Sequence, residues 1–106
     1  MFVFISHLTV PVDDHAALEQ HFRSRSRLVD GFPGFLYLQL LKPKAGAATH
    51  TFLTAWRDAD AFRAYMRSAE HAISHSREPA AIMRRTSVRH EAYDVLMDSR
   101  SEEVMG

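Results

Sequence analysis

Apolar and polar positions divide the chain into four short apolar segments and two longer amphipathic ones. The first apolar segment, at about residues 2–10, predicts a strand, because its residues are mostly β-branched or aromatic and Pro11 follows it. Both faces of this strand are largely apolar, with Phe2, Phe4 and Leu8 on one and Val3 and Ile5 on the other. One small domain has helices for a single face, so we expect the other face to meet a second copy.

The next segment predicts a helix at about residues 14–29, where Leu18, Phe22 and Val29 recur at helical spacing before Asp30 and Gly31. After a turn at residues 32–34, the run at 35–42 predicts a second strand. A short loop at 44–46 leads to a third strand at 49–56. The two strands are close enough along the chain to favour a hairpin.

The second half begins with Asp58 or Asp60 as the cap of a helix at about 59–68, and the helical pattern resumes at 69–75. Residues 77–87 show no clear period and predict a loop, and a last strand is expected at about 88–97. We expect one domain at 1–98 and a frayed tail at 99–106. The order βαββαβ predicts an α+β, ferredoxin-like fold, an antiparallel sheet with its helices on one face.

The composition and the net charge of the chain exclude several classes of function. The 106 residues suit a single domain, and 13 Lys and Arg balance 13 Asp and Glu. This balance leaves no basic surface typical of nucleic-acid or membrane binding, and no apolar run approaches the roughly 20 residues of a membrane span. The absence of cysteine excludes disulfides and thiolate sites and fits a cytoplasmic location. We expect no leader peptide and no processing.

Two histidines and a tyrosine on the second helical region are candidates for binding. His71 and His75 have the i, i+4 spacing of paired zinc ligands, but Ala72 stands where a zinc hydrolase needs its glutamate base. Solvated histidines at a helix end are the simpler interpretation. In a helix continuous from Tyr65, His75 would border the same cleft as Tyr65 and His71 would turn outward, whereas a break near Ser68 would void this geometry. Tyr65 alone suggests an edge-of-core ring with a wet hydroxyl.

Arg25 and Ser6 interrupt apolar faces. Arg25 falls inside the apolar stripe of the first predicted helix, so its guanidinium either reaches water or binds a carboxylate of a ligand, with His21 one turn earlier. Ser6 shares the face of Phe4 and Leu8, where its hydroxyl can orient a polar atom or bond to nearby backbone. The chain has no nucleophile-elbow or glycine-rich phosphate motif.

Four segments together carry a resemblance to a known family: FISHLTVP, RSRLVDGFPGFLYLQLLKP, TFLTAWRDADAFRAYMRSAEHAISH and HEAYDVLMD. The most specific pieces are the PGF turn at 33–35, the TAWRDADAFRAY stretch, and a histidine ten residues beyond its last aromatic residue. On these pieces the chain resembles the antibiotic-biosynthesis monooxygenase superfamily, and most of all its IsdG-type heme-degrading members. The resemblance implies a dimeric α+β barrel, with two sheets packed together and heme bound between helices and sheet.

The resemblance also implies roles for single residues. His75 falls where the family has the proximal histidine that ligates heme iron, and Phe22 and Arg25 fall where the first helix borders the heme and its propionates. Residues 77–87 correspond to a mobile segment over the pocket. Ser6 replaces an active-site asparagine that hydrogen-bonds the distal ligand, and Tyr65 replaces a tryptophan that presses on the heme. Serine still donates but is shorter, and tyrosine presents a smaller ring.

Three functions follow as hypotheses. In the first, a heme-binding monooxygenase uses dioxygen and an external electron donor, and heme is both cofactor and substrate. In the second, the same pocket oxidises phenols or quinols without a cofactor, after a histidine or arginine has favoured deprotonation of the substrate. In the third, a homodimer binds a small apolar ligand and performs no chemistry.

Overall fold

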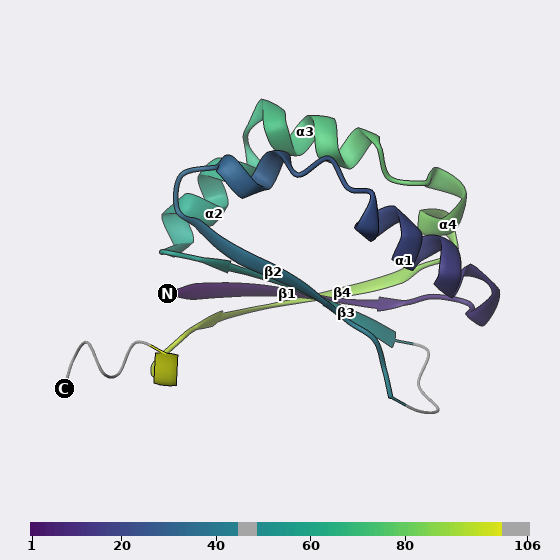
Figure 1. The fold of residues 1–106 in the computed structure, drawn as a ribbon, viewed down its shortest axis with the longest axis horizontal. Coiled ribbons are helices and arrows are strands. Elements are labelled where there is room, and N and C mark those ends of the chain that lie inside the picture. The colour runs from purple at the N-terminus through teal and green to yellow at the C-terminus, as the bar shows by residue number, and fades with distance from the viewer. Residues whose placement is uncertain (45–48, 101–106) are drawn as a thin grey trace.

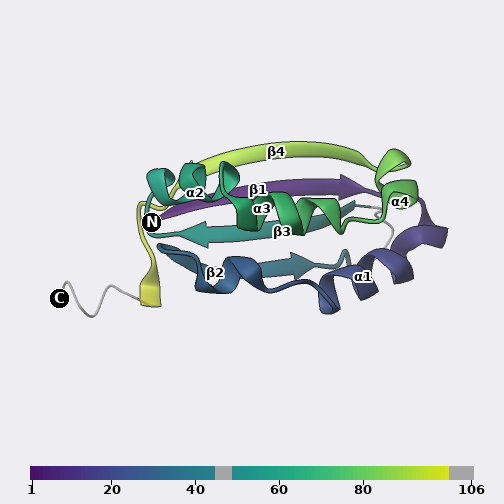
Figure 2. The same cartoon turned by 90° about the horizontal axis from the view of Figure 1, so that it is seen from above.

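The computed structural model describes residues 1–44 and 49–100. A four-stranded antiparallel sheet in the order β2-β3-β1-β4 forms one layer, and the helices lie over one of its faces (Figures 1 and 2). The strands are β1 (Phe2–Thr9), β2 (Phe35–Leu41), β3 (Thr49–Trp56) and β4 (Ser87–Asp94). The helices are α1 (His15–Arg23), α2 (Ala59–Met66), α3 (Ala69–Ser76) and α4 (Ala80–Arg84), with 3₁₀ turns η1 (Val12–Asp14) and η2 (Leu28–Gly31). The ferredoxin-like fold and the β2–β3 hairpin are thereby confirmed. In the described ranges no helix is long and apolar enough to cross a membrane.

Two apolar clusters join the helices to the sheet. One gathers Leu8, Val10, Leu18 and Ile82 near α1 and α4, and the other gathers Val29, Trp56, Ala61 and Tyr65 near α2. Trp56 is the largest fully buried side chain. Because successive residues of a strand point to opposite faces, Phe4, Ser6 and Leu8 of β1 share the helix-covered face. The space between the two clusters is where the cavity described below lies.

The first helix is shorter than predicted. α1 ends at Arg23 instead of continuing to residue 29, because the Ser24 hydroxyl donates to the carbonyl of Gln20 at 2.9 Å and Arg27 adopts a left-handed φ of 62°. A left-handed residue cannot continue a right-handed helix. Val29 therefore reaches the core from η2, and the helical stripe in which Arg25 was placed does not exist.

The second half of the chain contains three helices, of which α2 and α3 match the helix predicted at 59–68 and the helical pattern predicted at 69–75. The predicted cap Asp58 is confirmed, since its Oδ1 accepts the N–H of Ala61 at 2.8 Å. Ser68 then caps α3 by accepting the N–H of His71 at 3.1 Å, which separates α2 from α3. The loop prediction for 77–87 is wrong over α4, which Ile82 anchors in the core.

The C-terminal region also differs from prediction. β4 begins one residue earlier than predicted and ends at Asp94. In the predicted tail, Arg100 donates to the Tyr37 hydroxyl at 3.0 Å, while residues 101–106 lie outside the described residues. Most of the loop predicted at 44–46 also lies outside them.

The second sheet face carries no helix among α1–α4 (Figure 1). We call it the open face, and its members by strand register and alternation include Val3, Ile5, His7, Tyr37, Gln39, Leu41, Thr51, Leu53, Ala55, Arg89, Glu91 and Tyr93. Leu41 and Tyr93 are about half exposed. Glu91 is its polar centre, because it accepts from the Tyr93 hydroxyl at 2.6 Å and pairs with Arg89 at 3.2 Å. The open face is thus apolar around Val3, Ile5 and Leu53, polar at His7 and Thr51, and charged at β4.

A contact between a buried histidine and a glutamate makes the stability of the fold depend on pH. His50 of β3 is fully buried, and its Nε2 lies 2.8 Å from Oε2 of Glu19 on α1. The hydrogen bond from His50, aided by the charge of Lys42, lowers the pKa of Glu19 below 4.5. A carboxyl whose pKa is lowered by folding stabilises the native state above its unfolded pKa and loses that effect as the pH falls through the lowered value.

We therefore expect Glu19→Gln to be less stable than wild type at pH 7, with a difference that shrinks as the pH falls below 4.5. Urea unfolding at a series of pH values measures it. Asp13→Asn serves as the control, because Asp13 is exposed and has no charged partner among the described residues. A difference between wild type and Glu19→Gln that stays constant with pH would contradict the role of the ionised carboxylate.

Candidate functional site

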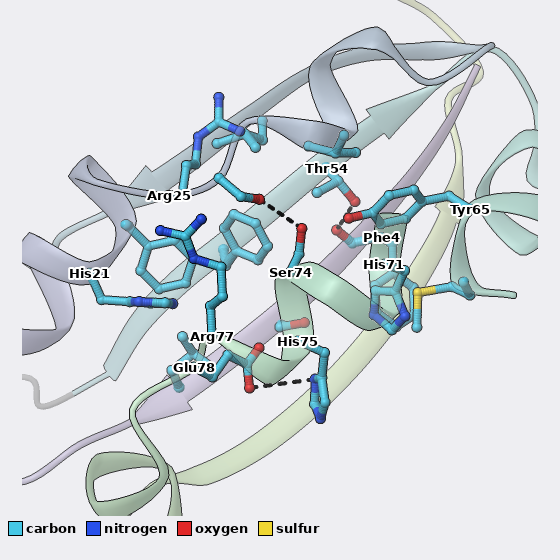
Figure 3. Close-up of a pocket in the computed structure, with 18 of the residues that line it drawn as sticks. Phe4, His21, Arg25, Thr54, Tyr65, His71, Ser74, His75, Arg77 and Glu78 are labelled. Atoms are coloured by element: carbon cyan, nitrogen blue, oxygen red, sulfur yellow. Dashed lines mark hydrogen bonds and ion pairs between the residues drawn. The ribbon is translucent and has the colours of Figure 1, made fainter. Parts of the chain in front are cut away.

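A cavity of about 590 Å³ lies between the helices and the sheet. This volume is within the range of roughly 300–1,000 Å³ that small-molecule sites occupy. The sheet supplies a mainly apolar wall, to which Phe4, Leu38, Phe52 and Trp56 contribute. α1, α3 and the segment after α1 supply the opposite wall, which carries most of the charged and titratable side chains (Figure 3).

α3 places two imidazoles at the cavity. The His71 ring lies 5.3 Å from the Tyr65 ring and 5.8 Å from the His75 ring, centre to centre. His75 is 68% exposed, and its Nδ1 lies 3.5 Å from a carboxylate oxygen of Glu78. The chain breaks at Ser68, which is the alternative that voids the geometry of a continuous helix, and His71 does not turn outward as it would in such a helix. Both histidines line the cavity (Figure 3).

Two guanidinium groups lie at the opposite end of the cavity from Tyr65. Arg25 pairs with Asp30 through contacts of 2.9 and 3.1 Å, and its side chain is 22% exposed. Arg77, at the end of α3, reaches back toward Arg25 and His21 (Figure 3). Arg77 could not be singled out by periodicity, because residues 77–87 show no clear period. Two neighbouring cations suit a ligand with carboxylates.

Tyr65 is a buried part of the cavity wall. It is 8% exposed, and its ring contacts Trp56 at 5.4 Å and Phe32 at 5.2 Å between ring centres. Burial raises the pKa of Tyr65, an effect that the Ser74 hydroxyl and the charge of Arg25 partly offset. The phenol is therefore neutral at physiological pH, and the expectation of an edge residue with a wet hydroxyl is wrong.

Ser6 contacts a residue that the sequence did not reveal. Its Oγ lies 2.9 Å from Nδ1 of His90 on β4, and both residues line the cavity. The only available signal was alternation, which puts His90 of the last strand on the same face as Ser6. On α1, Phe22 packs on Phe52 at 4.8 Å and His21 on Phe22 at 5.4 Å.

The structure thus brings the predicted site residues to one cavity, namely Ser6, His21, Phe22, Arg25, Tyr65 and His75. The sequence model described as antibiotic biosynthesis monooxygenase matches residues 1–77. The chain belongs to the antibiotic biosynthesis monooxygenase family. This family assignment agrees with the fold and with the first three of the four segments on which the resemblance rests, since the fourth, at 90–98, lies beyond the matched residues.

Individual proteins can also be compared with this member of the antibiotic biosynthesis monooxygenase family. A heme oxygenase (mycobilin-producing) of Mycobacterium tuberculosis is 35% identical over 82 residues, which are 74% of this chain and 77% of that protein. The structure of the heme-degrader MhuD from the same organism, with two hemes bound in its active site, matches with a TM-score of 0.79 and 28% identity, covering 92% of this chain and 98% of that one. SnoaB, a cofactor-independent oxygenase from Streptomyces nogalater, has a TM-score of 0.70 at 19% identity over 92% of this chain and 95% of its own, which shows the shared fold alone.

The donor set of this antibiotic biosynthesis monooxygenase suits heme better than a metal ion held by protein alone. Within the described residues no three His, Cys, Asp or Glu side chains come together as a metal site, so His71 and His75 find no third ligand there. An apolar cavity with an imidazole on one wall and guanidinium groups at one end offers what a porphyrin with two carboxylates and an open axial position requires.

Proposed function

We propose that this chain is a heme-binding monooxygenase that degrades heme oxidatively, using dioxygen and an external electron donor. The observation that carries the proposal is the arrangement of one cavity, with the exposed imidazole of His75 on the helix wall and Arg25 and Arg77 at one end. The 35% identical heme oxygenase and the heme-bound structure of MhuD support the same ligand.

The residues of the cavity have separable tasks. His75 would hold the iron through a ring nitrogen, because its contact with Glu78 at 3.5 Å is too long for a strong hydrogen bond and leaves the imidazole available. Arg25 and Arg77 neutralise the propionates, while Phe22, Phe52 and their neighbours exclude water from the porphyrin faces. When bound, heme supplies the iron that activates dioxygen and the ring that is oxidised.

Tyr65 and Ser6 are the proposed catalytic positions. The Tyr65 ring is held by Trp56 and Phe32, so it presents a fixed surface to a ligand in the cavity. Its buried, neutral phenol can donate a hydrogen bond to such a ligand without adding a negative charge to the cavity. Ser6 lies on the sheet wall with its hydroxyl bonded to His90, where it positions a proton.

Titration of the purified protein with hemin tests the proposal. We expect a saturable Soret band distinct from that of free hemin, and bleaching of this band when ascorbate is added under air. The same titration with iron-free protoporphyrin separates ring packing from iron ligation. A hemin titration that remains linear, like that of free hemin, would contradict heme binding.

A cofactor-independent oxidation of phenols or quinols is the second candidate. The observation that favours it is the His90 imidazole on the sheet wall, a base placed in the same cavity. Oxygen uptake by metal-free protein with a panel of hydroquinones would support this activity. A protein that neither binds hemin nor consumes oxygen would instead act as a ligand-binding module.

We further propose that two copies form a homodimer by packing their open faces together. Leu53 lies at the centre of the open face, between Ile5 and Gln39 in the strand register. A lysine there would place an unpaired charge in a buried interface, so Leu53→Lys should convert the dimer to a 12.1-kDa monomer. Sedimentation analysis measures the mass.

The control for this experiment is Val12→Lys, because Val12 is 73% exposed on η1 and away from the open face. It should leave the dimer intact. A wild-type protein that sediments as a monomer at tens of micromolar would rule out the interface.

A further inference from the structure

The sheet wall of the cavity contains a polar pair that joins two neighbouring strands, Ser6 and His90. They face each other directly on the antiparallel strands β1 and β4. Ser6 Oγ and His90 Nδ1 lie 2.9 Å apart, and Ser6 is only 8% exposed. A buried hydroxyl needs a hydrogen-bond partner, and this one has found it in an imidazole instead of a backbone carbonyl.

A second contact fixes the His90 ring. The Phe4 ring stacks on it with a centre-to-centre distance of 5.1 Å and an angle of 30°. One ring nitrogen is therefore taken by Ser6 and one ring face by Phe4. In the part of the chain that the structure describes, Nε2 has no hydrogen-bond partner. His90 is exposed at the edge strand β4 and also lines the cavity, so its ring connects solvent with the interior.

We infer that Ser6 and His90 work as one unit, in which Ser6 positions the imidazole and His90 donates a hydrogen bond from Nε2 to a small anion bound on the sheet-facing side of the heme iron. This inference rests on the proposed function, because it places the heme between α3 and the sheet. A ligand held by His75 from the helix wall turns its other face toward β1 and β4.

The chemistry of the pair explains why a serine can occupy this position. The Ser6 side chain is short, and its hydroxyl is held at the floor of the cavity by the contact with His90 Nδ1. A hydroxyl can donate to Nδ1 or accept from it, so it satisfies either tautomer of the ring. When Ser6 donates to Nδ1, the proton lies on Nε2 and is available to the ligand. His90 thus extends the reach of the serine and can be reprotonated from solvent.

The affinity of hemin-loaded protein for azide tests the unit, since azide is a small anion that binds ferric iron. His90→Leu should weaken azide binding about tenfold, as expected for the loss of one hydrogen bond to a charged group. His90→Gln keeps an N–H donor and should restore part of the affinity. Ser6→Ala should have a smaller effect than His90→Leu, and the double variant should bind azide no more weakly than His90→Leu alone.

The matched control is Thr9→Val, which removes a cross-strand hydroxyl contact of 2.9 Å to Thr49 at the far end of β1. It should leave azide affinity unchanged. The heme-free protein provides an independent measurement, because Ser6→Ala should shift the imidazole ¹⁵N resonances of His90 while Thr9→Val should not.

The outcomes separate this inference from the proposed function. A normal Soret band in His90→Leu together with unchanged azide affinity would overturn the inference and leave heme binding intact. A wild-type protein without a Soret band would overturn both. Should His90→Leu fail to fold, the azide affinity of Ser6→Ala and the ¹⁵N resonances decide the matter, and unchanged values in both would reject the unit.

Discussion

Replacement of His75, the proposed iron ligand, by alanine is expected to weaken hemin binding by more than about tenfold. The imidazole is 68% exposed and weakly paired with Glu78, so it can turn toward iron without breaking a strong contact. Because the substitution lies on a solvent-facing residue of α3, the fold should persist. Hemin titration followed by the Soret band measures the loss, and added imidazole should restore the band.

His71→Ala is the matched control, one turn earlier on the same helix and in the same cavity. The His71 ring packs against Tyr65, so its loss should lower hemin affinity modestly through packing and leave the spectrum of the ligated iron in place. If His71→Ala loses that spectrum and His75→Ala retains it, the iron ligand is His71 and the assignment of His75 is wrong.

Gly34→Ala is expected to cause the largest loss of stability, about 2–5 kcal/mol. Gly34 has a φ of +85°, and a Cβ atom there would lie 2.5 Å from the Cβ of Ala61 on α2. The first cost is left-handed backbone strain, about 1–2 kcal/mol for a residue with a side chain. The second is the clash, because neither methyl group can rotate away. Urea unfolding should show a lower midpoint.

Gly31→Ala provides the comparison, since no heavy atom lies within 4 Å of the Cβ that it would add. Its stability should be close to that of wild type. Equal midpoints for Gly34→Ala and Gly31→Ala would show that the turn before β2 does not constrain the approach of α2 to the sheet.

The strands and the membership of the site could be predicted from the sequence because both depend on local pattern. β3 has the predicted bounds, and β1 and β2 differ from prediction by only one residue at their ends. Alternation along β1 placed Ser6 on the helix-covered face, and the family resemblance drew attention to His75. The strand positions depend on residues that are close together in the chain, and the resemblance depends on short motifs that are recognisable even where single residues differ.

The missed features depend on contacts between distant residues. The end of α1 follows from the left-handed backbone at Arg27, which no propensity of arginine predicts. α4 is held by Ile82 in the core and by the ion pair of Arg85 with Asp14, 71 residues away along the chain. His90 of β4 belongs to the site through its contact with Ser6 of β1, which is far from it in the sequence. Tertiary packing determines the positions of these residues, and the periodic pattern of apolar residues along the chain carries no information about that packing.

The central position of β1 has a consequence for the order in which the molecule folds. β1 pairs with β3, about fifty residues later, and with β4, more than eighty residues later. β1 is therefore made before either of its two sheet partners, and its pairing is complete only after β4 has been made. Contacts of such long sequence separation slow folding, because the loop-closure entropy is lost before the pairing energy is gained. The hairpin of β2 and β3 is local enough to form first and to serve as the template onto which β1 docks.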